Sequence, residues 1–136
     1  MSGKAFFDTN VLLYSVSDDR RTERAEALLA GGGTISVQVL NEFAAVAHRK
    51  MKMPWADVIE ALAAIRILCP DPVPITVQTH EAALQLAIRY DYHYYDALVL
   101  AAALEGGCDT LYSEDLQSGQ RIEGRLTIRN PFAPEK

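Results

Sequence analysis

Residues 5–14, AFFDTNVLLY, join a short apolar run to an abrupt polar break. Ala5–Phe7 is typical of a short buried strand, and Asp8-Thr9-Asn10 is typical of a turn or of the start of a helix. Asp8 therefore directly follows a strand. In open α/β sheets, ligands bind beyond the carboxyl ends of the strands, so this aspartate occupies the position of a functional residue.

Outward from this segment, strands and helices alternate along the chain. We expect further strands at 34–37, 75–77, 110–112 and 126–128, and helices at 11–14, 19–29 (capped by Asp18 or Asp19), 38–50, 55–68, 80–89 (capped by Thr79) and 95–104. Three prolines between residues 69 and 74 exclude regular structure there. This order predicts an α/β fold, a three-layer α/β/α sandwich around a short, mostly parallel sheet. A single domain is expected to span residues 1–136.

The composition is that of a soluble folded protein, with 49% hydrophobic and 23% charged residues. No apolar run reaches the roughly 18–20 residues that span a bilayer. The N-terminus lacks the features of a signal peptide. Cys69 and Cys108 are far apart and outside any CxxC pattern. We therefore expect reduced thiols in a cytoplasmic protein, without a zinc site.

The formal net charge of −5 taken alone argues against binding to a nucleic-acid backbone. If several acidic residues surround divalent cations, however, the metal neutralises them and the remaining surface selects the partner. The basic residues form three groups: Arg20, Arg21 and Arg24; Arg49, Lys50 and Lys52; and Arg121, Arg125 and Arg129. Each group is typical of a solvated face or a helix end.

Three further acidic residues have positions that place them near Asp8. Asp115 follows the predicted strand at 110–112, so it lies on the same edge of a parallel sheet. Glu42 lies near the start of the helix after the second predicted strand, beside its apolar stripe. Asp96 opens an otherwise apolar helix. A carboxylate in such surroundings needs a partner, a metal ion or a wet helix terminus.

Singly, each acid has an ordinary structural explanation. Asp8 can cap a helix, Asp96 can complement the positive end of its helix, and Asp115 can cap a turn. Glu42 can pair with Arg49. Together, four converging carboxylates would repel one another, and oxygen-only ligands favour magnesium or manganese over zinc or copper. Two such ions can activate water and stabilise the leaving oxygen in phosphodiester cleavage. The combination predicts a metal-dependent nuclease.

Four stretches of this chain match the motifs of a known family and occur in the same order as in that family. The resemblance extends over nearly the whole sequence. The stretches are FDTNVLLY at 7–14, VLNEF at 39–43, YYDALVLAAA at 94–103 and LYSEDLQSGQ at 111–120. The chain resembles the PIN-domain family, and in particular the VapC-like ribonuclease toxins of type II toxin–antitoxin systems. The resemblance implies a parallel sheet with flanking helices and a Mg²⁺- or Mn²⁺-dependent endoribonuclease, a hydrolase of phosphodiester bonds.

The same resemblance implies the site and the partners. Asp8, Glu42, Asp96 and Asp115 correspond to the family's catalytic, metal-binding acids, with Glu114 as an alternative to Asp115. Thr9, Asn10 and Ser113 lie where such proteins often place hydroxyl or amide groups beside the metal, although capping the turn explains them equally well. The implied partners are an RNA substrate, a cognate antitoxin and a second copy in a homodimer, with no membrane.

Other functions fit less well. An aspartate-nucleophile phosphohydrolase needs a second acid two residues after Asp8, where this chain has Asn10. A receiver-like domain needs an acidic pair shortly before its main aspartate, and none is present. A non-toxin or non-catalytic PIN-like domain that binds RNA or protein stays open as the alternative. Absence of one of the four acids would favour it, and all four are present.

Overall fold

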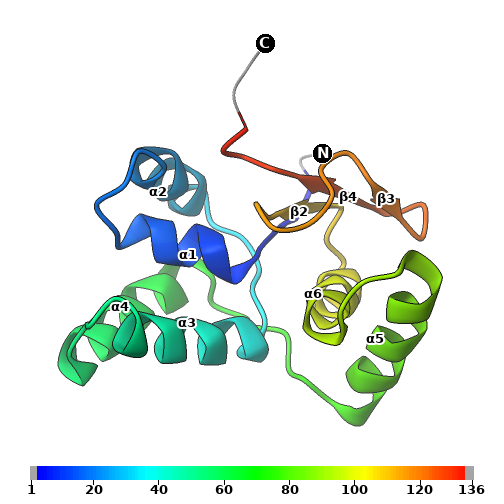
Figure 1. Cartoon of the computed structure of the whole chain (residues 1–136), viewed down its shortest axis with the longest axis horizontal. Helices are drawn as coiled ribbons and strands as arrows, with labels where there is room; N and C mark the ends of the chain where they lie inside the picture. The colour runs from blue at the N-terminus through cyan, green and yellow to red at the C-terminus, as the bar shows by residue number, and fades with distance from the viewer. Residues whose placement is uncertain (1–2, 134–136) are drawn as a thin grey trace.

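The computed structural model describes residues 3–133, in which helices and short strands alternate (Figure 1). The elements are β1 (Ala5–Phe7), α1 (Thr9–Ser15), α2 (Thr22–Ala30), α3 (Val37–Arg49), α4 (Trp55–Leu68), α5 (Val77–Tyr90), α6 (Tyr94–Glu105), β2 (Thr110–Tyr112), β3 (Arg121–Ile122) and β4 (Leu126–Arg129). None of the helices within this range is long and apolar enough to cross a membrane.

The strands form one sheet in the order β1-β2-β4-β3. β1 and β4 both run parallel to the central β2, and only β3 is antiparallel. Single bridges from Phe6 to Thr34 and from Ser36 to Val73 continue the parallel pairing beyond β1. The prediction of a mostly parallel sheet is confirmed.

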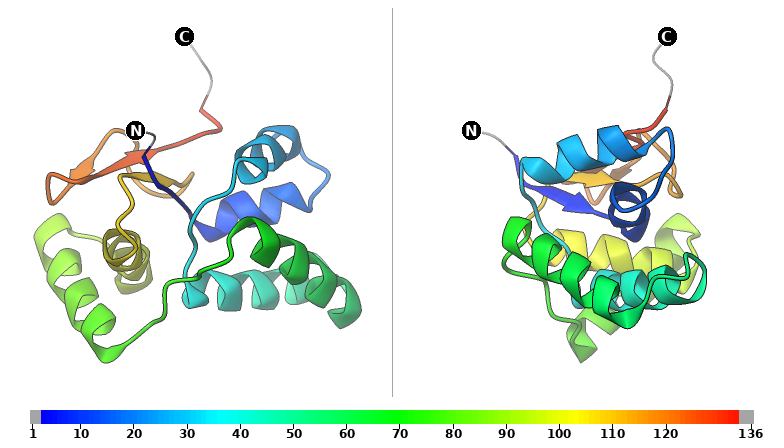
Figure 2. Two further views of the ribbon diagram at one scale, coloured as in Figure 1. Left: turned by 180° about the vertical axis from the view of Figure 1, so that it is seen from behind. Right: turned by 90° about the vertical axis from the view of Figure 1, so that its left-hand side faces the viewer.

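The helices lie in layers about this sheet. α6 and α5 lie below β2, β4 and β3 in Figure 1, whereas α1 to α4 gather on the β1 side. In the right-hand view of Figure 2, the strands lie between α2 and a layer that contains α3, α4 and α6. The α/β/α architecture expected from the sequence is confirmed.

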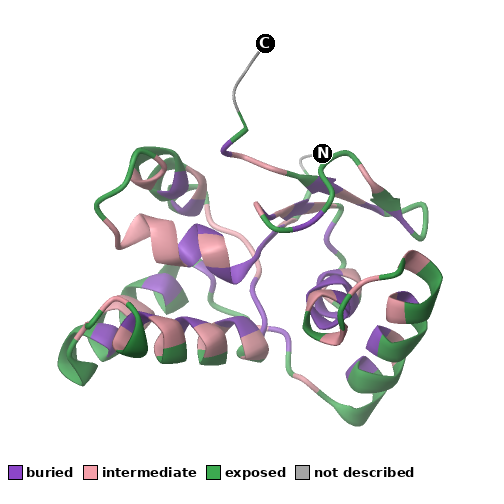
Figure 3. Ribbon diagram, viewed as in Figure 1, coloured by how far each residue is buried: buried purple, intermediate pink, exposed green. Residues whose placement is uncertain are grey.

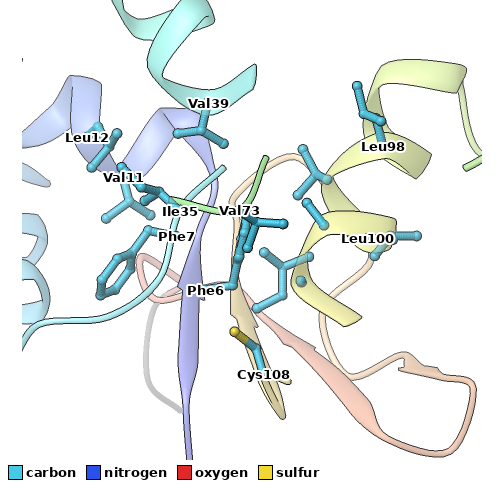
Figure 4. Close-up of a cluster of buried hydrophobic side chains, with 14 of the residues drawn as sticks. Phe6, Phe7, Val11, Leu12, Ile35, Val39, Val73, Leu98, Leu100 and Cys108 are labelled. Atoms are coloured by element: carbon cyan, nitrogen blue, oxygen red, sulfur yellow. The ribbon is translucent and has the colours of Figure 1, made fainter. Parts of the chain in front are cut away.

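The core joins the sheet to α6. Phe6, Leu111 and Ile128 are register partners on adjacent strands, and all three are fully buried. α6 is buried along Ala97–Ala103, and Figure 3 shows it in purple while the outer faces of α4 and α5 are exposed. On the other side of β1, Val11 and neighbouring residues of α1 and α3 complete the core (Figure 4). Burial of each large side chain contributes about 1.5–3 kcal/mol, which fixes the carboxyl ends of β1 and β2 next to each other.

Two predicted strands are wrong because polar caps start helices there instead. The segment 34–37 forms only the two isolated bridges, and the Ser36 side chain accepts a hydrogen bond from Val39 N (3.1 Å) as the N-cap of α3. The segment 75–77 contains no strand, because Thr76 caps α5 in a capping box with Thr79. Thr79 is therefore not the cap that the sequence predicted, but the third helical residue.

The start of α2 and the last hairpin also differ from expectation. Neither Asp18 nor Asp19 caps α2; its N-cap is Arg21, and the Asp19 carboxylate accepts a hydrogen bond from the backbone N of Arg21 (2.9 Å). β3 was not predicted. It joins β4 through a tight turn whose central residues, Glu123 and Gly124, both have positive φ, 53° and 65°. Positive φ at both positions is the requirement of a type I′ turn.

Candidate active site at the carboxyl edge of the sheet

Asp8 lies where β1 ends and α1 begins. It is the N-cap of α1, and its Oδ1 accepts a hydrogen bond from the backbone N of Thr9 (2.7 Å). Its Oδ2 accepts a hydrogen bond from Ser113 Oγ (2.7 Å), which comes from the end of β2. Only 7% of Asp8 is exposed. The capping role and the position at the strand edge, which the sequence left as alternatives, belong to the same carboxylate.

Asn10, in the first turn of α1, joins that helix to the loop after β2. Its Nδ2 donates to Asp115 Oδ2 (3.2 Å), and its Oδ1 accepts from the backbone N of Glu114 (3.2 Å). Ser113 Oγ also accepts from the backbone N of Asp115 (3.1 Å). Through Ser113 and Asn10, the carboxylates of Asp8 and Asp115 belong to one hydrogen-bonded group, and all of these polar residues lie at the carboxyl ends of neighbouring parallel strands.

Glu114 is engaged away from this group. Tyr14 OH donates to its Oε1 (2.5 Å), and Arg21 Nε forms an ion pair with its Oε2 (2.8 Å). The Arg21 guanidinium also lies 4.7 Å from the centre of the Tyr14 ring. Of the two adjacent acids, Asp115 is the one that shares hydrogen-bond partners with Asp8. The contacts of Tyr14 and Arg21 with Glu114 were not predicted from the sequence, because nothing local marks a contact across about a hundred residues.

Glu42 and Asp96 approach the same place from α3 and α6. Both side chains are partly buried. Burial raises the pKa of Glu42 above its ordinary value, and the charges of Asp96 and Asp115 raise it further. Burial also raises the pKa of Asp96, again with a contribution from Asp115 and a smaller opposing one from His93. These mutual effects place the two helix-borne carboxylates in the electrostatic environment of Asp115.

Asp8 is the most strongly affected of the four acids. Burial raises its pKa to about 6, against hydrogen bonds from Ser113 and Thr9 that lower it. The charges of Asp115 and Glu42 raise it further. The four predicted acids are therefore close enough for their charges to affect one another, and the pKa values of Asp8, Glu42 and Asp96 are each raised. A neighbouring cation would lower these pKa values.

The donor set fits a hard divalent cation in its chemistry. Its ligands are carboxylate oxygens, which suit magnesium or manganese, and the buried Thr9 Oγ1 beside Asp8 has no hydrogen-bond partner in the described chain. Within residues 3–133, however, no three His, Cys, Asp or Glu side chains lie close enough together to hold an ion as they stand.

The fold and the site together define a class of α/β protein with an acidic site at the carboxyl edge of a parallel sheet. The PIN-domain family model matches residues 5–120, which contain all four acids. The chain belongs to the PIN-domain family. No curated protein matches the sequence.

Three solved structures are similar to this fold. VapC20 of Mycobacterium tuberculosis, described as a toxin that cleaves the sarcin–ricin loop, is 24% identical with a TM-score of 0.68 and covers 82% of this chain and 90% of its own. A toxin–antitoxin complex from Klebsiella pneumoniae is 20% identical with a TM-score of 0.71, covering 95% and 98%. VapBC2 of Rickettsia felis, bound to promoter DNA, is 17% identical with a TM-score of 0.67, covering 93% and 97%.

Proposed function

We propose that this protein is a Mg²⁺- or Mn²⁺-dependent endoribonuclease and the toxin of a toxin–antitoxin pair. The observation that carries the proposal is the pair Asp8 and Asp115 at one sheet edge, with Glu42 and Asp96 close enough that burial and neighbouring carboxylates raise the pKa values of Asp8, Glu42 and Asp96. Proteins of the PIN-domain family are nucleases that generally use divalent metal ions. A two-metal arrangement suits four carboxylates, and the cytoplasm is the expected compartment.

Each residue has a defined part in the proposed hydrolysis. Asp8, Asp96 and Asp115 would hold the cation, which when bound supplies positive charge to the reacting phosphate and lowers the pKa of water. Ser113 keeps Asp8 in orientation, and Asn10 does the same for Asp115. Glu42 completes the ligand shell or orients the attacking water.

The water oxygen attacks phosphorus in line, and the bond from phosphorus to the 3′ oxygen breaks. The departing 3′ oxygen takes up a proton, and the proton of the water passes to a carboxylate or to solvent. The products carry a 5′-phosphate and a 3′-hydroxyl, as expected from the family resemblance.

The direct test is RNA cleavage by the purified chain. We expect the chain to cleave RNA when Mg²⁺ or Mn²⁺ is added. EDTA should stop the cleavage, and excess metal should restore it. Labelling of the new ends should find 5′-phosphates. Cleavage that continues in EDTA would overturn the metal mechanism, and absence of cleavage with either metal would favour the non-catalytic PIN-like domain that binds RNA or protein.

Glu114 and Asp115 give a matched pair of variants. Asp115→Asn is expected to lower kcat/KM by on the order of 10²-fold or more, since it removes a carboxylate of the proposed shell. Glu114→Gln keeps the Tyr14 contact and weakens the partly exposed ion pair with Arg21, so its activity is expected to stay within about 3-fold of wild type. The measurement is kcat/KM of both variants in steady-state cleavage of one RNA. A larger loss in Glu114→Gln than in Asp115→Asn would assign the catalytic role to Glu114.

A cognate antitoxin and a homodimer are the proposed protein partners. An apolar hollow of about 420 Å³ between α2 and α4 supports the proposal of an antitoxin partner. It is lined by Ser15, Val16, Glu26, Leu29, Ala30, Ala61, Ala64, Ile65 and Leu68. An amphipathic helix can bury its apolar face in such a groove. Three large aromatic residues lie outside this hollow: Phe43 is core, Trp55 stacks on His48, and Tyr14 binds Glu114.

A further inference from the structure

Along β2, β4 and β3, the sheet has a polar face opposite to α5 and α6. Along β2 and β4, Leu111 and Ile128 point into the core, so their neighbours Tyr112, Thr127 and Arg129 lie on the opposite face. In Figures 1 and 2, α5 and α6 cover only the core side of β3 and β4. A hollow of about 500 Å³ lies on the polar face.

This hollow is basic in a chain whose net charge is −5. Its lining contains four cations, Lys4, Arg121, Arg125 and Arg129, and a single acid, Asp109. Within residues 3–133, no ion pair closer than 4.0 Å involves any of these four cations. Their charge is therefore available to a ligand. The same three arginines appeared in the sequence only as a group typical of a solvated surface.

The hairpin of β3 and β4, which carries all three of these arginines, is anchored. Glu123, at its turn, accepts hydrogen bonds from Arg89 Nη1 (2.6 Å) and Tyr90 OH (2.8 Å) of α5. The carboxylate nearest in sequence to Arg121 and Arg125 is thus bound to α5. Arg121 Nη2 donates to the carbonyl oxygen of Gly124 (2.6 Å), which leaves other guanidinium donors of Arg121 for a ligand.

The basic hollow extends along the sheet to the carboxyl ends of β2 and β4, where Tyr112 and Arg129 line it. Tyr112 stacks on the buried Phe7 (ring centroids 6.0 Å apart, interplanar angle 17°) and immediately precedes Ser113. Arg129 is the register partner of Tyr112, and its carbonyl oxygen accepts a hydrogen bond from Ser113 N (3.0 Å). An aromatic ring and an arginine therefore stand one residue from the hydroxyl that binds Asp8.

We propose that this polar sheet face binds the sugar–phosphate backbone of single-stranded RNA and directs it over the edge to the four carboxylates. The inference rests on the proposed ribonuclease function and deepens it. Arginines that follow a strand of RNA, together with a partly exposed aromatic ring such as that of Tyr112, are the chemistry of sequence-independent single-strand binding. The acidic site itself repels phosphate, so a separate cationic surface is needed to retain the strand.

Binding is measured with the Asp8→Asn chain, so that the probe stays intact, and a fluorescent single-stranded RNA of about 20 nucleotides. Adding Arg121→Gln, Arg125→Gln and Arg129→Gln is expected to weaken binding by at least about 10-fold near 0.1 M salt. The slope of log K against log salt should fall by about 2, because each lost phosphate contact on single strands accounts for about 0.7. The matched control is Arg49→Gln, Lys50→Gln and Arg66→Gln, three exposed cations elsewhere, with the same change in net charge.

Equal weakening by the two triple variants, or an unchanged slope, would overturn the proposal. Replacing the same three arginines with lysine keeps the charge and should keep the slope, which separates loss of binding from loss of folding. In the active chain, the glutamine variant should raise KM for long RNA more than it lowers kcat. If the wild type cleaves RNA and the glutamine variant has the same KM, the proposed RNA-binding role of this face is refuted and the proposed nuclease activity is kept. If the wild type does not cleave RNA at all, the proposed function itself is refuted.

Discussion

Asp8→Asn and Asp96→Asn are each expected to lower RNA cleavage by on the order of 10³-fold or more, because residues that act as one unit lose most of the rate when any member is removed. An asparagine in place of Asp8 can still accept the hydrogen bond from Thr9 N, so the site keeps its shape and loses a charge. The measurement is kcat/KM on a fluorogenic RNA at saturating Mg²⁺. Asp71→Asn, an exposed acid away from the site, is the control and should match wild type.

The same substitution tests the toxin part of the proposed function. Expression of the wild-type chain in a bacterial host is expected to arrest growth, and Asp8→Asn is expected to restore it at equal protein level. Full cleavage activity in both variants would refute the catalytic assignment. If an inactive Asp8→Asn chain still arrests growth, toxicity does not depend on cleavage. The proposed toxin role through cleavage would then be refuted, and only the proposed nuclease activity would be kept.

Asp8→Asn is also expected to stabilise the fold at neutral pH in the absence of divalent cations. The pKa of Asp8 rises from 3.8 to about 6 in the folded chain. Between these values the folded state binds more protons than the unfolded state, so stability falls as pH rises through this window. At 1.36 kcal/mol per pKa unit, the full loss above the window is about 3 kcal/mol.

Urea unfolding in EDTA provides the measurement. The variant should exceed wild type by up to about 3 kcal/mol near pH 8 and show little or no gain near pH 4, where Asp8 is largely protonated in the folded chain. Adding Mg²⁺ should stabilise the wild type more than the variant, because a ligand that binds only the folded state adds to its stability. If the wild type and the variant have equal unfolding curves at both pH values, burial does not destabilise the charged form of Asp8.

Most of the sheet, and the positions of Asp8 and Asp115 after its strands, could be predicted from the sequence because strand ends leave local marks. Ala5–Phe7 followed by Asp8 is an apolar run that ends on a capping residue, and 110–112 ends in the same way. The errors come from competing local signals. Thr34–Val37 and Ile75–Val77 contain β-branched residues that favour strands, but Ser36 and Thr76 cap helices at the same points.

What the sequence could not predict depends on distant partners. The two residues of β3 become a strand only by pairing with β4, and no periodic pattern can show so short an element. The hydrogen bonds of Asn10 to the 113–115 loop, and the binding of Glu114 by Tyr14 and Arg21, join segments about a hundred residues apart. The roles of the four acids stay a prediction until the variants are measured.

The strand order has a consequence for when the protein can act. β2 carries Ser113 and Asp115 at its end and lies between β1 and β4, which are near opposite ends of the sequence. During synthesis Asp8 leaves the ribosome early, but the strand that completes its surroundings gains its second neighbour only after residue 129. We expect the nascent chain to be inert until β4 has been synthesised and can pair with β2. The time that synthesis of this protein takes is thus time in which the cell can supply the proposed antitoxin.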